Sequence, residues 1–399
     1  MNKDTKEVEK STLKTFQEEI PSIYFSDKDI QEFEKYKKNA EYLYRDLLKF
    51  PPKMFDNSKL IDFGAGTGEN TVYLANWGAK CTLVEMNNKA QKISKEVFQK
   101  HTNNYQDHKF ILSSIFDFTS EEKFDIVHCR GVLSHTNDKE RAFSKISSFL
   151  RPGGYLIFGD PNKAGGFQNM LQRYIIYKFA DDWDKMVKVA EYLFKEDIDR
   201  SQEAIGRTRR AIIFDRWVIQ KQDDPSIKEV LQWLDSNNLN LYSSYPPIIP
   251  SVLGDSAHHQ IKFKPQSFKD IGVLTEAVWL MQNESDKQEI PKILQSFLEL
   301  SQKQSSLTSY MSDFNSNSEV NKNELKHLIE EYKKAFAKTN IITHLSKRMD
   351  IFLEEIKQLL DTVETNDIDR VKSFISNTKY LFRGALGVRH VDFIAYKKP

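Results

Sequence analysis

The sequence predicts an α/β fold built around a doubly wound, Rossmann-like parallel sheet. Five short apolar runs lie at 59–63, 80–85, 109–113, 124–129 and 154–159. Stretches with helical spacing of apolar residues separate most of them, at about 69–77, 89–101 and 138–149. Such alternation is typical of a parallel sheet that helices cover on both faces. The first run also continues into a turn with three glycines and then into a helix.

Length and composition set the outer limits of the fold. A chain of 399 residues is too long for one typical core, so we expect two domains or one domain with a large insertion. Hydrophobic residues make up 39% and charged residues 29%, as in globular proteins. The 58 Lys and Arg residues balance the 57 Asp and Glu residues, so no nucleic acid partner is expected.

Three features predict a cytoplasmic protein. No uncharged apolar run approaches the ~20 residues that a membrane span needs. The first twenty residues alternate lysine with acidic residues and lack the apolar core of a secretory signal. Only two cysteines occur, Cys81 and Cys129, which is too few for a disulfide framework.

The segments before the first strand are expected to form a helical lead-in over residues 1–50. Residues 1–27 are polar with one short amphipathic piece, and a helix is predicted from about 29 to 48. Pro51 and Pro52 end this helix, because proline lacks a backbone donor and clashes with the preceding turn.

The segments after residue 160 are predicted to be mostly helical. Helices are expected over 165–221 and 227–237, followed by a short strand at 240–245. From 254 to 380 the pattern is helical, with one Ser-, Asn- and Lys-rich break at 301–323 that predicts a mobile linker. The helices predicted after this break are expected to pack within their own domain, with a coiled-coil partner site as the alternative. A last strand is predicted at 390–396.

The turn after the first strand carries the strongest functional signal. Glycines alternate with other residues in Gly64-Ala65-Gly66-Thr67-Gly68, and Asp62 stands two residues before them. Glycine is required where a chain turns sharply and a ligand touches the backbone. A dinucleotide turn instead has the spacing G-x-G-x-x-G, which seats a pyrophosphate.

Two acids define the ligand that this turn fits. Asp62 would repel a pyrophosphate but suits a ligand with an ammonium group. Glu85 ends the second strand, where a carboxylate can accept hydrogen bonds from both ribose hydroxyls. Each feature alone is weak, since an acid at a strand end is often only a helix cap. Together they predict a site for a nucleoside that bears an amino acid.

Residues 59–160 resemble the class I S-adenosylmethionine-dependent methyltransferases, in the branch of the ubiquinone/menaquinone-biosynthesis methylases. The matching segments are the glycine turn, 113–117, 124–129 and 150–156, and a weaker likeness continues through 206–210 and 215–217. The resemblance implies S-adenosyl-L-methionine as cofactor. The residues expected to bind it are Asp62, Gly64, Ala65, Gly66, Thr67, Gly68, Asn70, Glu85, Met86, Ser114, Ile115, Asp117, Cys129 and Arg130.

One departure from the family concerns the adenine. Family members often carry an acid at the position of Ser114, where it holds the adenine amino group. Here Ser114, Asp117 three residues later, and the backbone of Ile115 stay open as alternatives.

The resemblance also implies a seven-stranded class I methyltransferase sheet with a large helical insertion. The segment 240–245 would be the sixth strand, and 390–396 an antiparallel seventh strand inserted beside it. The domains expected are a lead-in at 1–50, the methyltransferase core at 51–253, the insertion at 254–380 and the final strand of the core at 381–399. Such an insertion is expected to shape acceptor choice or to form a homo-oligomer.

The methyl acceptor is expected to bind beyond the fourth and fifth strands. His135 is the candidate general base, and the structural alternative is that it packs below the cofactor or caps the next helix. The Asn/Asp/Ser-Pro-Pro-Tyr motif of many amino-group methylases is absent. The candidate acceptor-site residues are aromatic, amide and arginine side chains of 1–50 and 160–260. They are Tyr44, Asn162, Tyr174, Arg207, Arg210 and Trp217, with Tyr42, Arg173, Tyr177 and Arg216 as further candidates.

The function expected is methylation of a small molecule on oxygen, nitrogen or carbon. Macromolecular methylation, a non-catalytic cofactor-binding module and an NAD-dependent oxidoreductase are the alternatives. Arg207, Arg209 and Arg210 would suit a carboxylate or phosphate on the acceptor, or form a solvated basic face. No metal is expected, because adjacent His258 and His259 point apart and have no third ligand.

Overall fold

A computed structural model describes the chain in two compact units. The first comprises Met1–His258 with Leu386–Pro399, and the second comprises His259–Ala385. The residues described are 3–21, 23, 25, 30–163, 166–205, 207–245, 247, 286–314, 320–339, 343–383 and 390–398. No helix among these residues is long and apolar enough to cross a membrane.

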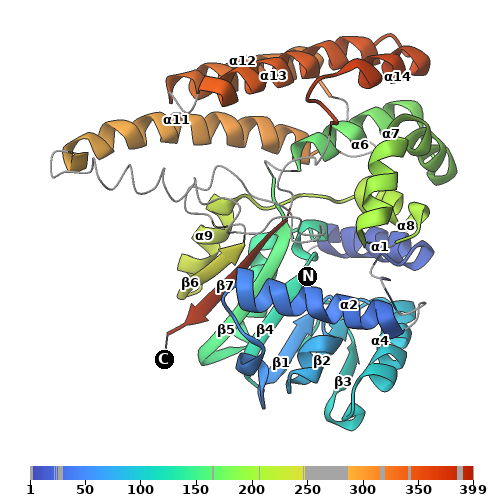
Figure 1. The fold of residues 1–399 in the computed structure, drawn as a ribbon, viewed down its shortest axis with the longest axis vertical. Coiled ribbons are helices and arrows are strands. Elements are labelled where there is room, and N and C mark those ends of the chain that lie inside the picture. Colours follow the sequence, from blue (N-terminus) through green and yellow to red (C-terminus); the bar gives the residue numbers. More distant parts are fainter. Residues whose placement is uncertain are drawn as a thin grey trace. The chain divides into compact units, whose positions relative to one another are not determined.

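The first unit contains a seven-stranded sheet in the order β3-β2-β1-β4-β5-β7-β6 (Figure 1). Its strands are β1 (Lys59–Phe63), β2 (Lys80–Glu85), β3 (Lys109–Leu112), β4 (Phe124–Arg130), β5 (Leu150–Pro161), β6 (Leu239–Tyr245) and β7 (His390–Lys397). The last strand, β7, lies between β5 and β6 and is antiparallel to both, while the other pairs are parallel. The predicted seven-stranded fold and its inserted antiparallel strand are confirmed.

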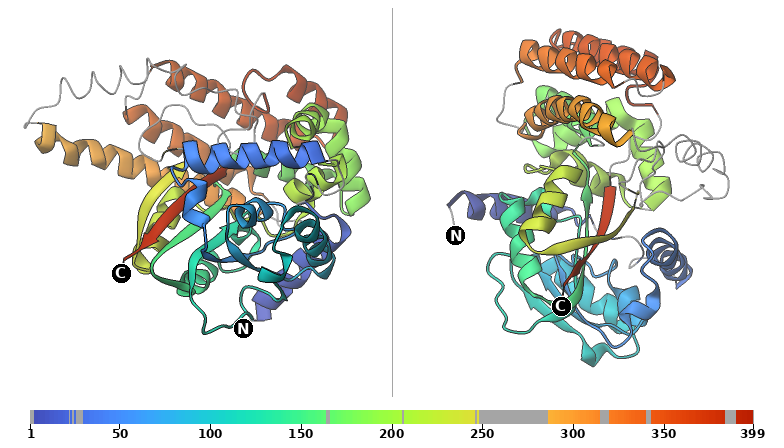
Figure 2. Two further views of the ribbon diagram at one scale, coloured as in Figure 1. Left: turned by 60° about the horizontal axis from the view of Figure 1, so that its bottom comes forward. Right: turned by 90° about the vertical axis from the view of Figure 1, so that its left-hand side faces the viewer.

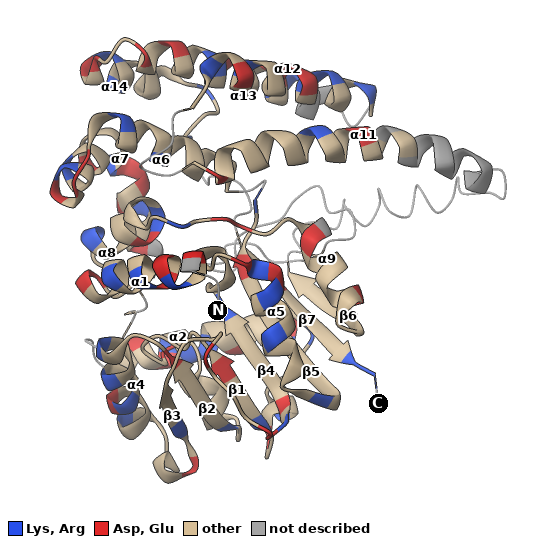
Figure 3. Cartoon of the chain, turned by 180° about the vertical axis from the view of Figure 1, so that it is seen from behind, with Lys and Arg blue, Asp and Glu red and all other residues tan. Residues whose placement is uncertain are grey.

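Helices cover both faces of this sheet, as the edge-on view in Figure 2 shows. On one face η1 (Tyr42–Leu47), α3 (Val72–Asn76) and α4 (Asn88–His101) pack against Leu60, Ile126 and Ile157. On the other face α5 (Lys139–Ser148) and α9 (Ile227–Ser236) pack against Ile61, Val127 and Leu156 (Figure 3). From β1 the strand order proceeds through β2 and β3 to one edge of the sheet, and from β4 it proceeds to the other edge. A crevice for ligands is expected at this switch point, outside the carboxyl ends of the parallel strands β1 and β4.

Helix caps explain where several of these helices begin. The Asn87 side chain accepts hydrogen bonds from the backbone of Lys89 and Ala90 and starts α4. Ser226 and Glu229 form a capping box at the start of α9. The helix expected from 69 is shorter, because Gly68 holds the chain in a turn and α3 begins only at Val72.

Further helices of this unit are α1 (Lys3–Glu18), α2 (Ile30–Glu41), α6 (Phe167–Phe179), α7 (Trp183–Ile205), α8 (Arg209–Ile213) and the π-helical turn η5 (Phe214–Val218). α1 lies over the carboxyl edge of the sheet. The backbone oxygen of Phe16 accepts a 2.9 Å hydrogen bond from the Asn87 side chain, which follows β2. The Thr12 hydroxyl donates to the backbone oxygen of His135, which follows β4, at 3.4 Å.

The second unit is helical in its described part. It contains α11 (Asp286–Ser312), α12 (Lys322–Lys338), α13 (Thr343–Val363) and α14 (Ile368–Asn377). The predicted linker at 301–323 is therefore wrong for its first half, which belongs to α11. Leu307 and Met311 give this polar segment a buried stripe. Its hydroxyls bond to carbonyls one turn earlier, as in Thr308 to Gln304 at 2.8 Å, so the helix accommodates them.

Candidate functional site

The turn after β1 requires its glycines. Gly64, Gly66 and Gly68 have φ of 70°, 54° and 71°, in the left-handed region that side chains disfavour. A Cβ on Gly64 would lie 2.5 Å from a methyl group of Val132, and one on Gly68 would lie 2.6 Å from the Ser94 hydroxyl. Between them Ala65 and Thr67 are buried, and Asn70 is half-buried after the turn. The backbone of the turn is thus held open in one conformation.

Glu85 at the end of β2 is tied to this turn. Its Oε2 accepts a 2.7 Å hydrogen bond from the Gly66 backbone, and its Oε1 accepts one of 2.7 Å from the Asn87 backbone. Burial raises the pKa of the Glu85 carboxyl, and these hydrogen bonds oppose that rise. A carboxylate has about four acceptor positions, and the backbone of Met86 also donates to this one, so a place is left for a ligand hydroxyl. Met86, the next residue, is half-buried.

Asp62 is at the centre of a buried hydrogen-bond chain. Its Oδ1 accepts from Nδ1 of His128 at 2.7 Å, and its Oδ2 accepts from the Thr71 hydroxyl. With Nδ1 donating, Nε2 of a neutral His128 accepts from the Tyr44 hydroxyl at 3.1 Å. Sequence reasoning missed Thr71 and His128 as its partners. A histidine at an inward position of the apolar strand β4 is the signal that could have identified His128.

Tyr44, a candidate for the acceptor site, belongs to this buried hydrogen-bond chain. Tyr44 is fully buried and packs edge-on against Phe55 and Trp77 in the core on the α3 side. Its hydroxyl therefore bonds to His128 below the sheet edge, and the structure does not bring it together with His135.

The adenine candidates follow β3. The Ser114 hydroxyl accepts from the Asp117 backbone at 3.2 Å, Ile115 is buried, and Asp117 is exposed. Glu9 of α1 also bonds to the Ser114 side chain, and burial raises the pKa of the Glu9 carboxyl. Sequence reasoning missed Glu9, because its contact depends on how α1 lies over the sheet.

At the end of β4, Cys129 and Arg130 point to opposite faces. Cys129 is fully buried, and burial raises the pKa of its thiol well above the usual value, which disfavours the thiolate. Arg130 forms two hydrogen bonds to Asp392 of β7, from Nε at 2.6 Å and from Nη2 at 3.0 Å. Gly159 of β5 lies between them, and a Cβ there would collide with the Asp392 carboxylate.

His135 ends the short helix η4 (Leu133–His135) after β4. Its Nδ1 is 3.0 Å from the backbone oxygen of Lys221, and the ring of Phe16 packs edge-on at 5.3 Å. Because a carbonyl only accepts, Nδ1 carries the proton, and a neutral imidazole keeps its lone pair on Nε2. The structure thus presents His135 as a possible proton acceptor in a half-buried position.

Asp160 at the end of β5 supports the His135 loop. Its Oδ2 accepts from the Ser134 backbone at 3.2 Å, while its Oδ1 is buried with no hydrogen-bond partner. Burial and the nearby Asp224 raise the pKa of this carboxyl well above the usual value. Sequence reasoning assigned no role to Asp160.

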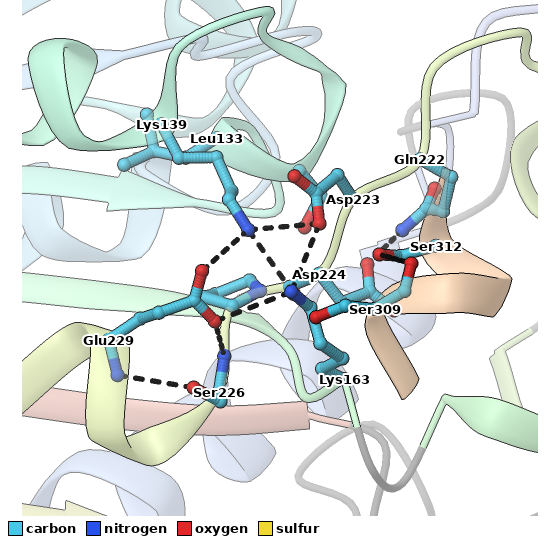
Figure 4. A network of polar contacts seen from close by, with 12 residues as sticks. Leu133, Lys139, Lys163, Gln222, Asp223, Asp224, Ser226, Glu229, Ser309 and Ser312 are labelled. Carbon is cyan, nitrogen blue, oxygen red and sulfur yellow. Dashed lines mark hydrogen bonds and ion pairs between the residues drawn. The ribbon is translucent and has the colours of Figure 1, made fainter. Parts of the chain in front are cut away.

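A charged cluster holds the segment 219–226, to which His135 bonds (Figure 4). Lys139 of α5 lies 3.0 Å from Asp223 and 3.1 Å from Glu229. Lys163, after β5, lies 3.4 Å from Asp223 and 3.5 Å from Glu229. Burial favours neutral lysine, but the two acids outweigh it and raise the pKa of Lys139. The cluster therefore ties α5, the end of β5 and α9 around this segment.

The other acceptor candidates lie in the helices after β5. Asn162 lies 3.5 Å from the Pro225 backbone oxygen, and Tyr174 is buried in α6. Trp217 is fully buried and donates to Gln172 at 3.2 Å. Two arginines have acidic partners: Arg207 pairs with Asp215 at 2.7 Å, and Arg210 with Glu19 at 2.9 Å and Asp184 at 3.3 Å.

Among the described residues, no group of three or more His, Cys, Asp or Glu side chains is placed to hold a metal ion. His258 and His259 lie outside the described residues.

Known proteins similar to this chain include methyltransferases. A family model described as "Methyltransferase domain" matches residues 36–201. The chain is 33% identical over 101 residues to an uncharacterized protein of Synechococcus, covering 25% of this chain and 24% of that protein. It is 31% identical over 107 residues to a ubiquinone biosynthesis O-methyltransferase of Coxiella burnetii, covering 26% of this chain and 44% of the relative.

The chain is also similar to a methyltransferase of known structure. Magnesium protoporphyrin IX methyltransferase from Synechocystis, with bound S-adenosylmethionine, is 13% identical; the comparison covers 61% of this chain and 90% of that chain with a TM-score of 0.35. The chain spans less than two thirds of the length of the first curated relatives that it matches.

Proposed function

We propose that this chain, which carries a class I S-adenosylmethionine-dependent methyltransferase domain, transfers the methyl group of that cofactor to a small-molecule acceptor, on oxygen, nitrogen or carbon. The observation that carries the proposal is the glycine turn after β1 with Glu85 hydrogen-bonded to Gly66 at 2.7 Å. The names of the curated relatives, ubiquinone biosynthesis O-methyltransferases, favour a small acceptor.

The residues present fit the cofactor. Val132 and Ser94 would meet a Cβ at Gly64 and Gly68, so only glycine keeps this backbone in place for a ligand. Glu85 accepts from three backbone donors and keeps acceptor capacity for a ribose hydroxyl. Ser114, Ile115 and Asp117 follow β3, where the adenine would lie. When bound, S-adenosylmethionine supplies an electrophilic methyl group on a positively charged sulfur.

The protein's own contribution would be alignment, exclusion of water and acceptance of a proton. Alignment of the two reactants can supply much of the rate enhancement of a displacement reaction. α1 covers the carboxyl edge of β2 and β4 through Phe16 and Thr12 and would exclude water there. His135, with its lone pair on Nε2, would accept the proton of a hydroxyl or ammonium acceptor.

The first experiment is isothermal titration calorimetry with S-adenosylmethionine, S-adenosylhomocysteine and NAD. We expect saturable binding of the first two and none of NAD; saturable binding of NAD alone would overturn the proposal. The acceptor class is then tested by incubating the protein with tritiated S-adenosylmethionine and a fractionated cell extract. Label in the low-molecular-weight fraction is expected, whereas label in RNA or protein alone would exclude a small acceptor.

The proton-acceptor hypothesis for His135 needs a readout that separates chemistry from binding. The variant His135→Gln should lower kcat by roughly 10²–10⁴-fold, the range for loss of a general base, and leave S-adenosylhomocysteine affinity unchanged. A kcat within threefold of the native enzyme at every pH would assign His135 to packing.

A further inference from the structure

Arg173 of α6 is a buried cation with only neutral partners. Only 2% of the surface of Arg173 is exposed. Nη2 donates to the backbone oxygens of Ile219 at 2.8 Å and Gln220 at 3.2 Å, and to the Tyr177 hydroxyl at 3.2 Å. Nε is buried without a partner, and within the described ranges Nη1 donates to nothing. No carboxylate of the described residues therefore balances this charge.

The other buried cations of the described chain differ from Arg173 in this respect. Each has a carboxylate within 4 Å: Arg130 pairs with Asp392, Arg216 with Asp197, and Lys139 and Lys163 each with Asp223 and Glu229. A buried charge is costly unless it is paired, and carbonyl oxygens compensate it only in part. The fold thus leaves at Arg173 a positive charge with N–H donors to spare.

Arg173 is bound to the same segment as His135. Ile219 and Gln220 accept from Arg173, and Lys221, the next residue, accepts from Nδ1 of His135 at 3.0 Å. Tyr177, one turn after Arg173 on α6, also donates to Ile219 at 3.3 Å. The segment 219–221 therefore links the unpaired cation to the candidate proton acceptor, at the end of the sheet where α6 follows β5.

We propose that Arg173 binds an anionic group of the methyl acceptor, a carboxylate or a phosphate, and so holds the acceptor next to His135. This inference rests on the proposed methyltransferase function. Guanidinium groups bind these two anions preferentially, because their planar donors match the anion's oxygens. The half-buried Arg209 and Arg210 do not offer the same site, because they already pair with acids of α7 and at the end of α1.

The test measures anion binding to the full-length protein loaded with S-adenosylhomocysteine. Benzoate, inorganic phosphate and the neutral analogue benzyl alcohol are titrated by calorimetry into the native protein and into Arg173→Gln. Arg151→Gln is the matched control, because Arg151 is 48% exposed and pairs with Asp125 at the opposite edge of the sheet. We expect saturable binding of benzoate or phosphate to the native protein and the control, at least tenfold weaker binding to Arg173→Gln, and none of benzyl alcohol.

The outcomes separate the inference from its premise. Failure of the native protein to bind S-adenosylhomocysteine would overturn the proposed function. Binding of that product with no saturable anion binding, or equal anion affinity in native protein and Arg173→Gln, would overturn only the role of Arg173. Binding of benzoate but not phosphate identifies a carboxylate, and the reverse identifies a phosphate. If Arg173→Gln does not bind S-adenosylhomocysteine, Arg173→Lys replaces it: weakened anion binding supports the inference and unchanged binding overturns it.

Discussion

The ion pair between Arg130 and Asp392 should stabilise the sheet strongly, and Asp392→Asn tests this. The two side chains are 7% and 0% exposed and share two hydrogen bonds, of 2.6 and 3.0 Å. The substitution removes the negative charge and leaves Arg130 buried without it. Breaking a buried pair from one side costs about 3–5 kcal/mol, and because Asn keeps one acceptor oxygen we expect about 3 kcal/mol less unfolding free energy.

Urea unfolding followed by tryptophan fluorescence measures this loss of unfolding free energy in the unit that contains the sheet. Four of the five tryptophans, Trp77, Trp183, Trp217 and Trp233, belong to the unit that contains the sheet. The double variant Arg130→Met/Asp392→Leu is the control, since an apolar pair of similar volume removes the unpaired charge and should recover most of the loss. A loss below about 1 kcal/mol for Asp392→Asn would refute the reasoning.

The same pair predicts a dependence on pH. Burial alone would raise the pKa of Asp392, but Arg130 and His390 together outweigh burial and hold that pKa far below the usual range. A carboxyl with a lowered folded-state pKa stabilises the fold above its unfolded pKa of about 3.9, and this contribution is lost as pH falls toward the folded value. The difference between native protein and Asp392→Asn should therefore be full at pH 7 and shrink below about pH 4.

Two further substitutions test the cofactor site and its support. Glu85→Ala should weaken S-adenosylhomocysteine binding by roughly 1.5–3 kcal/mol in calorimetry, because charge-assisted hydrogen bonds are lost; unchanged affinity would exclude Glu85 as the ribose-binding acid. Asp160→Asn should flatten the pH dependence of stability above pH 4. Burial raises the pKa of Asp160, so the native protein holds a proton that the unfolded chain has lost, and unfolding free energy should fall by about 1.4 kcal/mol per pH unit until the folded carboxyl ionises. Parallel pH profiles for the two proteins would contradict this.

Much of the fold and the cofactor turn could be predicted because their signals are local. Alternating apolar runs mark β1 to β5, and the spacing of Gly64, Gly66 and Gly68 reflects backbone angles that other residues disfavour. The position of β7 between β5 and β6 came from a family resemblance, since the 144 residues between β6 and β7 carry no local signal for that pairing. The polar composition of 301–312 led to the wrong prediction of a mobile linker, because composition does not show that hydroxyls bond within their own helix.

The sequence by itself determined the glycine turn, the acid at the end of β2 and the succession of β1 to β5 along the chain, since these depend on backbone conformation and on residues close together in the chain. Only the tertiary structure decided the partners of the charged side chains. Arg130, expected at the cofactor, bonds to Asp392, 262 residues later, because β5 and β7 are adjacent and Gly159 leaves room between them. Only the tertiary structure likewise shows that Arg173 is buried without a carboxylate partner among the described residues. Whether a buried charge is paired depends on which segments the fold brings around it.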